Sequence, residues 1–157
     1  MTDYSVVHDT FTITRVYAAS PARVFAAFAD ASIKRRWFAE GEEWRVESFS
    51  LDFRIGGREE ARFRFKETTE IRNDTVYLDI VKDRRIVNAY TMTFAEKRIS
   101  ASLSTFEIAP VGDGARLTYT EQGAFFDGAD GAKVREQGWR TLFDRLDHEM
   151  KGHDMKG

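Results

Sequence analysis

The chain has 157 residues and a net charge of −2, so it carries no excess of basic side chains to bind a nucleic acid. It contains no cysteine, which excludes disulfides, thiol nucleophiles and zinc–thiolate sites and is typical of the reducing cytoplasm, where we expect the protein. The length suits one domain, residues 1–157, with a core expected over about residues 9–150. No apolar run approaches the roughly 20 residues that span a bilayer, and the polar N-terminus predicts no signal peptide.

The first third of the chain predicts a strand followed by two short helices. Thr10–Tyr17 alternates polar and apolar residues, which is typical of a half-buried strand. Ser20 is a good helix N-cap, and Pro21 suits the first helical position because no N–H is needed there. The apolar residues of Ile33–Phe38 predict the second short helix.

From Glu43 onward the sequence has a period of two and predicts about six strands. The alternation slips at Glu47–Ser48, which predicts a bulge, and Gly56–Gly57 predicts a tight turn. Within Ile99–Leu103 the apolar residues alternate with serines, and we expect a second slip just before Phe106.

The remainder of the chain predicts one long helix, from Asp130 to about Met150. Its apolar stripe is expected to comprise Val134, Gly138, Leu142 and Leu146, widened by Trp139, Phe143 and Met150. Glycine inside a helix costs about 1 kcal/mol relative to alanine, so Gly138 needs a compensating role. The pattern favours close packing of the helix on the sheet at Gly138, and space left for a ligand is the alternative.

Together these elements predict an α+β fold in which a curved, mostly antiparallel sheet of about seven strands wraps around the C-terminal helix. A resemblance to a known family rests on the order and spacing of Thr14-Arg15, Ala19-Ser20-Pro21, Val24-Phe25, Arg36-Trp37, Asp52–Gly57, Thr118–Phe126, Gly138-Trp139 and Leu142. The chain resembles the START-like, or SRPBCC, helix-grip superfamily, and within it the branch related to the activator of heat-shock-protein-90 ATPase. Members of this superfamily include binders of lipids, sterols and plant metabolites, polyketide cyclases and a co-chaperone, so the fold alone does not assign a function.

The resemblance implies a hydrophobic cavity between the sheet and the long helix, and a solid core is the alternative. The residues expected to line this cavity are Trp37, Phe63, Phe65, Tyr90, Met92, Tyr119, Glu121, Trp139, Leu142 and Phe143. We therefore expect a protein that binds a small apolar or amphipathic molecule. The alternatives are a cyclase-, dehydratase- or hydrolase-like enzyme that uses inward polar residues, and a chaperone-associated interaction module.

Two charged residues are in phase with apolar positions on their strands. Arg15 shares a face with Ile13 and Tyr17, and Glu121 shares a face with Tyr119. Because the resemblance implies that the first and last strands are neighbours, we expect Arg15 and Glu121 to face each other near the cavity wall. Such a pair could anchor a ligand head group or act as an acid–base pair, although a structural ion pair is favoured.

The remaining signals are weaker. The basic run Lys34–Arg36 could attract an anionic ligand, although the solvated face of a short helix is favoured. His8, His148 and His153 lack an acidic partner at metal-ligand spacing, so no metal site and no other cofactor are predicted. No nucleophile elbow or phosphate loop is present, and whether the chain is an enzyme is left open, with binding favoured. The patterns are compatible with a monomer or a homodimer.

Overall fold

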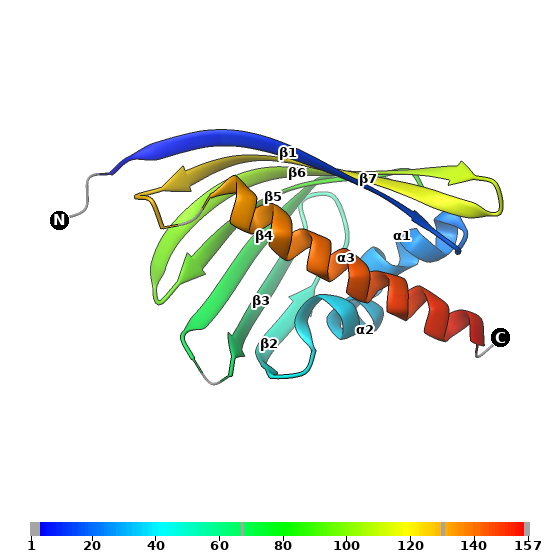
Figure 1. The fold of residues 1–157 in the computed structure, drawn as a ribbon, viewed down its shortest axis with the longest axis horizontal. Coiled ribbons are helices and arrows are strands. Elements are labelled where there is room, and N and C mark those ends of the chain that lie inside the picture. Colours follow the sequence, from blue (N-terminus) through cyan, green and yellow to red (C-terminus); the bar gives the residue numbers. More distant parts are fainter. Residues whose placement is uncertain (1–3, 67, 130, 156–157) are drawn as a thin grey trace.

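The computed structural model describes residues 4–66, 68–129 and 131–155, and it confirms the predicted fold class. Seven antiparallel strands form one curved sheet, and a long helix crosses one of its faces (Figure 1). The strands are β1 (Val6–Tyr17), β2 (Trp44–Leu51), β3 (Arg58–Phe65), β4 (Glu70–Val81), β5 (Arg85–Phe94), β6 (Lys97–Val111) and β7 (Gly114–Phe126). The helices are α1 (Pro21–Ala29), α2 (Ala31–Lys34), the π-helical turn η1 (Arg35–Ala39) and α3 (Ala132–Met155). The first residue of the predicted long helix, Asp130, lies outside the described residues.

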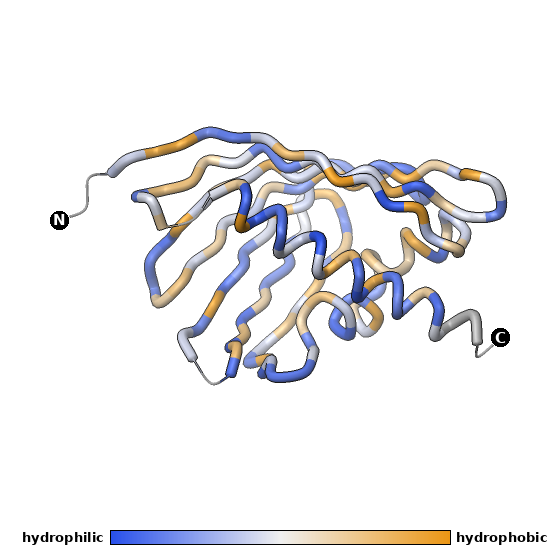
Figure 2. Tube along the Cα trace, viewed as in Figure 1, coloured by the Kyte–Doolittle hydropathy of each residue, from blue (hydrophilic) through white to orange (hydrophobic). Residues whose placement is uncertain are grey.

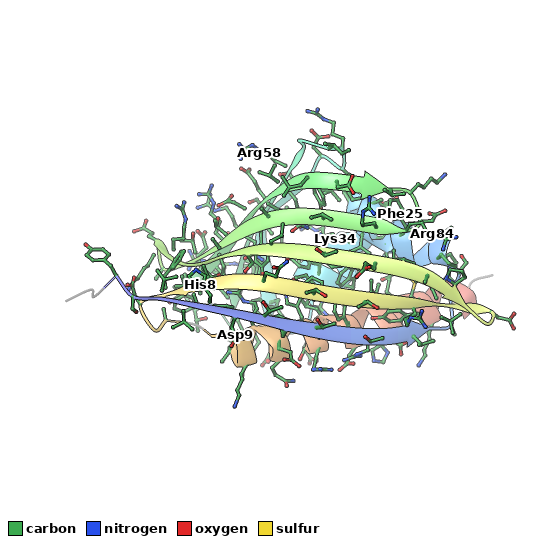
Figure 3. All side chains as sticks on the ribbon, turned by 90° about the horizontal axis from the view of Figure 1, so that it is seen from above. His8, Asp9, Phe25, Lys34, Arg58 and Arg84 are labelled. Atoms are coloured by element: carbon green, nitrogen blue, oxygen red, sulfur yellow. The ribbon has the colours of Figure 1, made fainter. Side chains whose placement is uncertain are left out.

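The strand order is β1-β7-β6-β5-β4-β3-β2, so the first strand pairs with the last one at an edge of the sheet, as the resemblance implied. The other neighbours follow one another in sequence as hairpins. The sheet is open and ends on β1 and β2. Figure 3 shows the sheet from above, with α3 lying behind the strands, so this face of the sheet carries none of the described helices.

The expected bulge in β2 is confirmed, because its register with β3 shifts between Val46 and Ser48. The slip expected before Phe106 is wrong. The register of β5 with β6 shifts instead between Met92 and Thr93, near the start of β6. As a result Ser100, Ser102 and Ser104 point inward and are buried, whereas Leu103 is 37% exposed. Buried serine hydroxyls need hydrogen-bond partners, and the inner face of the sheet supplies them.

The predicted second short helix divides into α2 and η1. The Ser20 hydroxyl caps α1 by accepting a hydrogen bond from the Arg23 N–H, and the Asp30 carboxylate caps α2. The wider π-helical turn that follows buries Trp37, Phe38 and Ala39 together. The Trp37 indole donates a hydrogen bond of 2.9 Å to the Ala27 carbonyl, which fixes η1 against α1.

The long helix buries part of the expected stripe, namely Trp139, Phe143, Leu146 and Met150, and it also buries Arg135, which was not expected. Val134, by contrast, is 71% exposed. A strict four-residue spacing drifts around a helix of 3.6 residues per turn, so Val134 lies off the buried side. Figure 2 shows the mixture of hydrophilic and hydrophobic residues along α3 that this one-sided burial requires. In the described ranges, no helix has the length and apolar character needed to cross a membrane.

The C-terminal part of α3 carries much of the packing energy. Phe143 is fully buried against the rings of Tyr119 and Trp139. We therefore expect Phe143→Ala to lower the free energy of unfolding by about 3–5 kcal/mol, because it leaves a cavity in the core. The exposed Val134→Ala on the same helix should change it by less than about 0.5 kcal/mol. Chemical denaturation of both variants measures the difference, and similar values would contradict this packing.

Candidate ligand-binding cavity

A cavity of about 680 Å³ lies between α3, η1 and the inner face of the sheet. Its apolar lining includes Phe38, Phe63, Ile71, Met92, Phe106 and Trp139. Cavities of 300–1,000 Å³ with mainly apolar walls are typical small-molecule sites, and close-packed protein interiors seldom contain spaces of this size.

The cavity reaches the molecular surface beside the first turn of α3. Phe94 at the end of β5 and Val134 on α3 both line it, and they are 46% and 71% exposed. Gly41, Glu42 and Arg145 line it where the loop before β2 approaches α3. The opening beside Phe94 and Val134 is thus apolar, which allows a hydrophobic molecule to approach it.

Five of the ten residues expected to line the cavity do so in the structure. They are Phe63, Tyr90, Met92, Trp139 and Leu142. They come from β3, β5 and α3, which are elements that surround the open space.

The other five residues lie elsewhere. Trp37 and Phe143 belong to the solid core next to the cavity. Phe65 packs against Trp44 at the edge of the sheet, with ring centroids 4.9 Å apart. Tyr119 and Glu121 are fully buried behind the cavity wall, where they hydrogen-bond to each other.

Glu121 is the centre of a buried hydrogen-bond network. Its carboxylate accepts hydrogen bonds from the hydroxyls of Tyr119 at 2.6 Å, Tyr90 at 2.9 Å and Ser102 at 2.7 Å. The Arg135 guanidinium lies 3.1 Å from the carboxylate and also donates to the Tyr90 and Ser100 hydroxyls. The carboxylate is therefore neutralised and fully hydrogen-bonded, as a buried charge requires.

The expected pairing of Arg15 with Glu121 is wrong. In the β1–β7 register Arg15 lies opposite Leu117, and Glu121 lies opposite Phe11. The two residues share a face, but four residues of strand separate them by about 13 Å. Arg15 instead forms an ion pair of 2.6 Å with Asp144 on α3, so each expected partner has a different counterion from the helix.

A second buried ion pair lines the cavity. Lys34 Nζ lies 2.6 Å from a carboxylate oxygen of Glu59, which also accepts a hydrogen bond from the Tyr77 hydroxyl. Lys34 is 4% exposed and its ammonium lies over the Phe38 ring at 4.8 Å. The interpretation of Lys34–Arg36 as a solvated helix face is thus wrong for its first residue.

The sequence interpretation missed most of the polar lining. Asn73 and Thr75 on β4, Asn88 on β5 and Arg135 on α3 all line the cavity and are buried. Asn73 and Thr75 are in phase with buried Tyr77, and Asn88 is in phase with buried Tyr90. This shared phase was the sequence signal that these residues point inward. Polar residues at inward positions of a strand are characteristic of binding sites as well as of structural networks.

Gly138 lines the cavity instead of packing closely on the sheet. A Cβ atom built on Gly138 has nothing within 4 Å, so the favoured explanation of close packing is wrong. The missing side chain instead leaves open space beside Trp139 and Leu142. The helix therefore forgoes the stabilisation that alanine would provide, and the cavity gains volume.

Burial keeps the tyrosines around the cavity protonated. Desolvation, reinforced by the nearby Glu121 charge, raises the pKa of Tyr90 well above its usual range. Burial also raises the pKa of Tyr119 strongly, and burial together with the Glu59 charge does the same for the pKa of Tyr77. Each of these hydroxyls therefore remains a hydrogen-bond donor to its carboxylate over the physiological range.

A curved antiparallel sheet, a cavity and a C-terminal helix across it define a helix-grip protein of the START-like superfamily. The chain belongs to the family of activator of Hsp90 ATPase homolog 1-like proteins, whose family model matches residues 18–151. No curated protein sequence matches it.

Solved structures similar to this chain come from several bacteria. A protein from Rhizobium loti is 53% identical, with a TM-score of 0.86 over 93% of this chain and 99% of its own. A protein from Rhizobium leguminosarum is 37% identical, with a TM-score of 0.91 over 96% of this chain and 99% of its own. One from Chromobacterium violaceum is 25% identical, with a TM-score of 0.76 over 90% of this chain and 96% of its own.

The buried network predicts that removing one charge costs far more than removing both. Arg135→Met leaves the Glu121 carboxylate without its counterion and should lower the free energy of unfolding by about 3–5 kcal/mol. Adding Glu121→Gln to this variant should restore much of that loss. Arg140→Met, which removes a partly exposed pair on the same helix, should cost less than about 1 kcal/mol. Denaturant unfolding measures all three, and a double variant no more stable than Arg135→Met would contradict the network.

The buried tyrosines also predict the alkaline behaviour of the protein. The folded-state pKa values lie above the unfolded value of about 10 for Tyr17, Tyr77, Tyr90 and Tyr119. The contribution of these tyrosines to the free energy of unfolding is therefore complete below pH ~10 and is lost as the pH rises further. At about pH 11 these four of the five tyrosines should remain protonated until the protein unfolds. Tyrosinate absorbance during a pH titration measures this, and gradual ionisation without unfolding would refute it.

Proposed function

We propose that the protein binds a small apolar or amphipathic molecule in the cavity beneath α3. The cavity itself carries this proposal, because about 680 Å³ of largely apolar space remains in a chain whose core is otherwise densely packed. In a protein interior, a large apolar space with a few placed polar groups is the usual form of a ligand site.

In this proposal the direct ligand contacts include Phe63, Met92 and Trp139, which present apolar surface from opposite walls. Tyr90 presents its ring to the same space, while its hydroxyl is held by Glu121. Glu121 and Tyr119 act from behind the wall by fixing the position of Tyr90.

The arrangement of Glu121 supports binding in preference to acid–base catalysis. A general base needs a lone pair directed at the substrate, and a general acid needs a proton to transfer. The Glu121 oxygens already accept hydrogen bonds from Tyr90, Tyr119, Ser102 and Arg135, and the residue does not line the cavity. Glu59 does line the cavity, but its carboxylate is paired with Lys34 at 2.6 Å and accepts the Tyr77 hydroxyl, so its oxygens are likewise occupied.

Gly138 offers a direct test of the cavity. Gly138→Leu places an apolar side chain in the open space and should weaken binding of the uncharged fluorescent dye Nile red at least about tenfold, which is 1.4 kcal/mol. Leucine is a better helix former than glycine by several tenths of a kcal/mol, so the variant should remain at least as stable as the wild type. Fluorescence titration and thermal unfolding measure the two effects.

Gly152→Leu is the matched control, because Gly152 lies on the same helix, has nothing within 4 Å of a Cβ atom built there and does not line the cavity. It should bind the dye as the wild type does. Equal binding by all three proteins would show that the dye does not enter this cavity. Native mass spectrometry of the purified wild type extends the test, since a bound passenger should be reduced in Gly138→Leu but not in Gly152→Leu.

A further inference from the structure

The chain contains two asparagines, and both line the cavity. Asn73 on β4 is 7% exposed and Asn88 on β5 is 5% exposed. Within the described part of the chain, the side-chain oxygen of each has no hydrogen-bond partner. Buried polar groups are nearly always paired, so two unpaired carboxamide oxygens on residues that line one cavity indicate an absent partner.

The buried cations of the cavity wall already have partners. Lys34 is paired with Glu59, and Arg135 is paired with Glu121. Both of these positive charges are therefore balanced by a negative charge beside them. In the part of the cavity that these two pairs line, a ligand ion would lose its hydration without gaining a counterion, so this part favours an uncharged group.

The sheet register separates the two asparagines along the cavity floor. Asn88 lies opposite Tyr77, whereas Asn73 lies opposite Met92. Four residues of strand therefore separate them, which corresponds to about 13 Å. Thr75 and Tyr90 face each other between these two positions. One functional group cannot reach both carboxamides, so a ligand that satisfies both carries two polar groups.

The opposite wall of the cavity has an apolar stretch on α3 between Arg135 and Arg145. On α3 the open position at Gly138 lies between the Trp139 and Leu142 side chains, and all three line the cavity. A ligand therefore meets the two carboxamides on the sheet, and it meets apolar surface both at this stretch of the helix and at Phe63 and Met92 of the sheet. This arrangement fits an amphipathic molecule with its polar groups directed to the asparagines of β4 and β5.

A hydroxyl group matches a carboxamide best. The carboxamide both donates and accepts hydrogen bonds, and so does a hydroxyl, whereas an ammonium only donates and a carboxylate only accepts. The torsion about the asparagine Cβ–Cγ bond is broad, so either end of the amide can turn toward the cavity.

We propose that the ligand of this cavity is an uncharged amphipathic molecule whose hydroxyl groups bind Asn73 and Asn88 while its apolar surface contacts α3. This inference rests on the proposed function, since it specifies the ligand of the same cavity.

The test uses probes with the same ten-carbon chain, namely the α,ω-diol, the mono-alcohol and the carboxylate, in competition with Nile red. The diol spans about the distance between the two asparagines. The wild type should bind the diol most tightly and the carboxylate at least about tenfold more weakly. Asn73→Leu and Asn88→Leu should each weaken diol binding about two- to tenfold, as expected for one hydrogen bond.

Thermal unfolding of the ligand-free protein provides a second measurement, in which the same variants should gain stability although they lose affinity for the diol. Each leucine variant removes an unpaired buried polar group, so its Tm without ligand should rise by a few degrees. A merely structural role for the asparagines would instead lower the Tm. Gln122→Leu is the matched control, because Gln122 is an exposed carboxamide on β7, and it should leave diol binding unchanged.

The outcomes separate this inference from the proposed function. If no probe and no dye bind the wild type, the binding function itself fails. If Nile red binds but the diol does not compete, or the carboxylate competes best, the ligand class is wrong. If the diol binds equally to the wild type and to both leucine variants, the asparagines do not recognise it and the inference is overturned.

Discussion

The structure depends on the contact between Arg135 and Glu121, which fixes one end of the long helix to the sheet. The guanidinium reaches from the first part of α3 to a carboxylate on β7 and to hydroxyls on β5 and β6. Farther along α3, the buried side chains of Phe143, Leu146 and Met150 fix the helix by packing. Trp139 packs on Phe106 and Tyr119 between these two places, while Gly138 and Leu142 beside it face open space. A cavity bridged in this way does not depend on a ligand to stay open.

The same constraint determines the electrostatic character of the cavity. A cation that reaches into a buried site needs an anion beside it, and this chain provides two such pairs, at Arg135–Glu121 and Lys34–Glu59. Both carboxylates also accept tyrosine hydroxyls, whose raised pKa values follow from their burial. In the binding mode that we propose, these paired charges build the wall, and the neutral groups of Asn73 and Asn88 meet the ligand. Four buried charges that are matched in pairs are compatible with the uncharged ligand of this proposal.

Sequence periodicity predicted the elements better than it predicted the cavity. The phase slip at Glu47–Ser48 identified a real bulge, because an extra residue in a strand shifts every later side chain to the other face. In β6 the same reasoning was wrong, since apolar Leu103 was assumed to point inward, whereas Ser102 and Ser104 do so. Hydrophobicity cannot assign a face when the interior contains a polar network. Glu121 was correctly placed inward, but its partner comes from α3, and no strand pattern specifies how a helix docks.

Gly138 and the two asparagines share a physical property that distinguishes them from the surrounding core. Each is less stabilising at its position than a simple alternative. Alanine or leucine would strengthen the helix at Gly138, and an apolar side chain would remove an unpaired polar group at Asn73 or Asn88. Sites that bind ligands commonly contain residues that lower the stability of the empty protein, because groups kept available for a ligand are unsatisfied without it. That three such residues face the same space is the strongest structural reason to regard the cavity as a binding site and not as a packing defect.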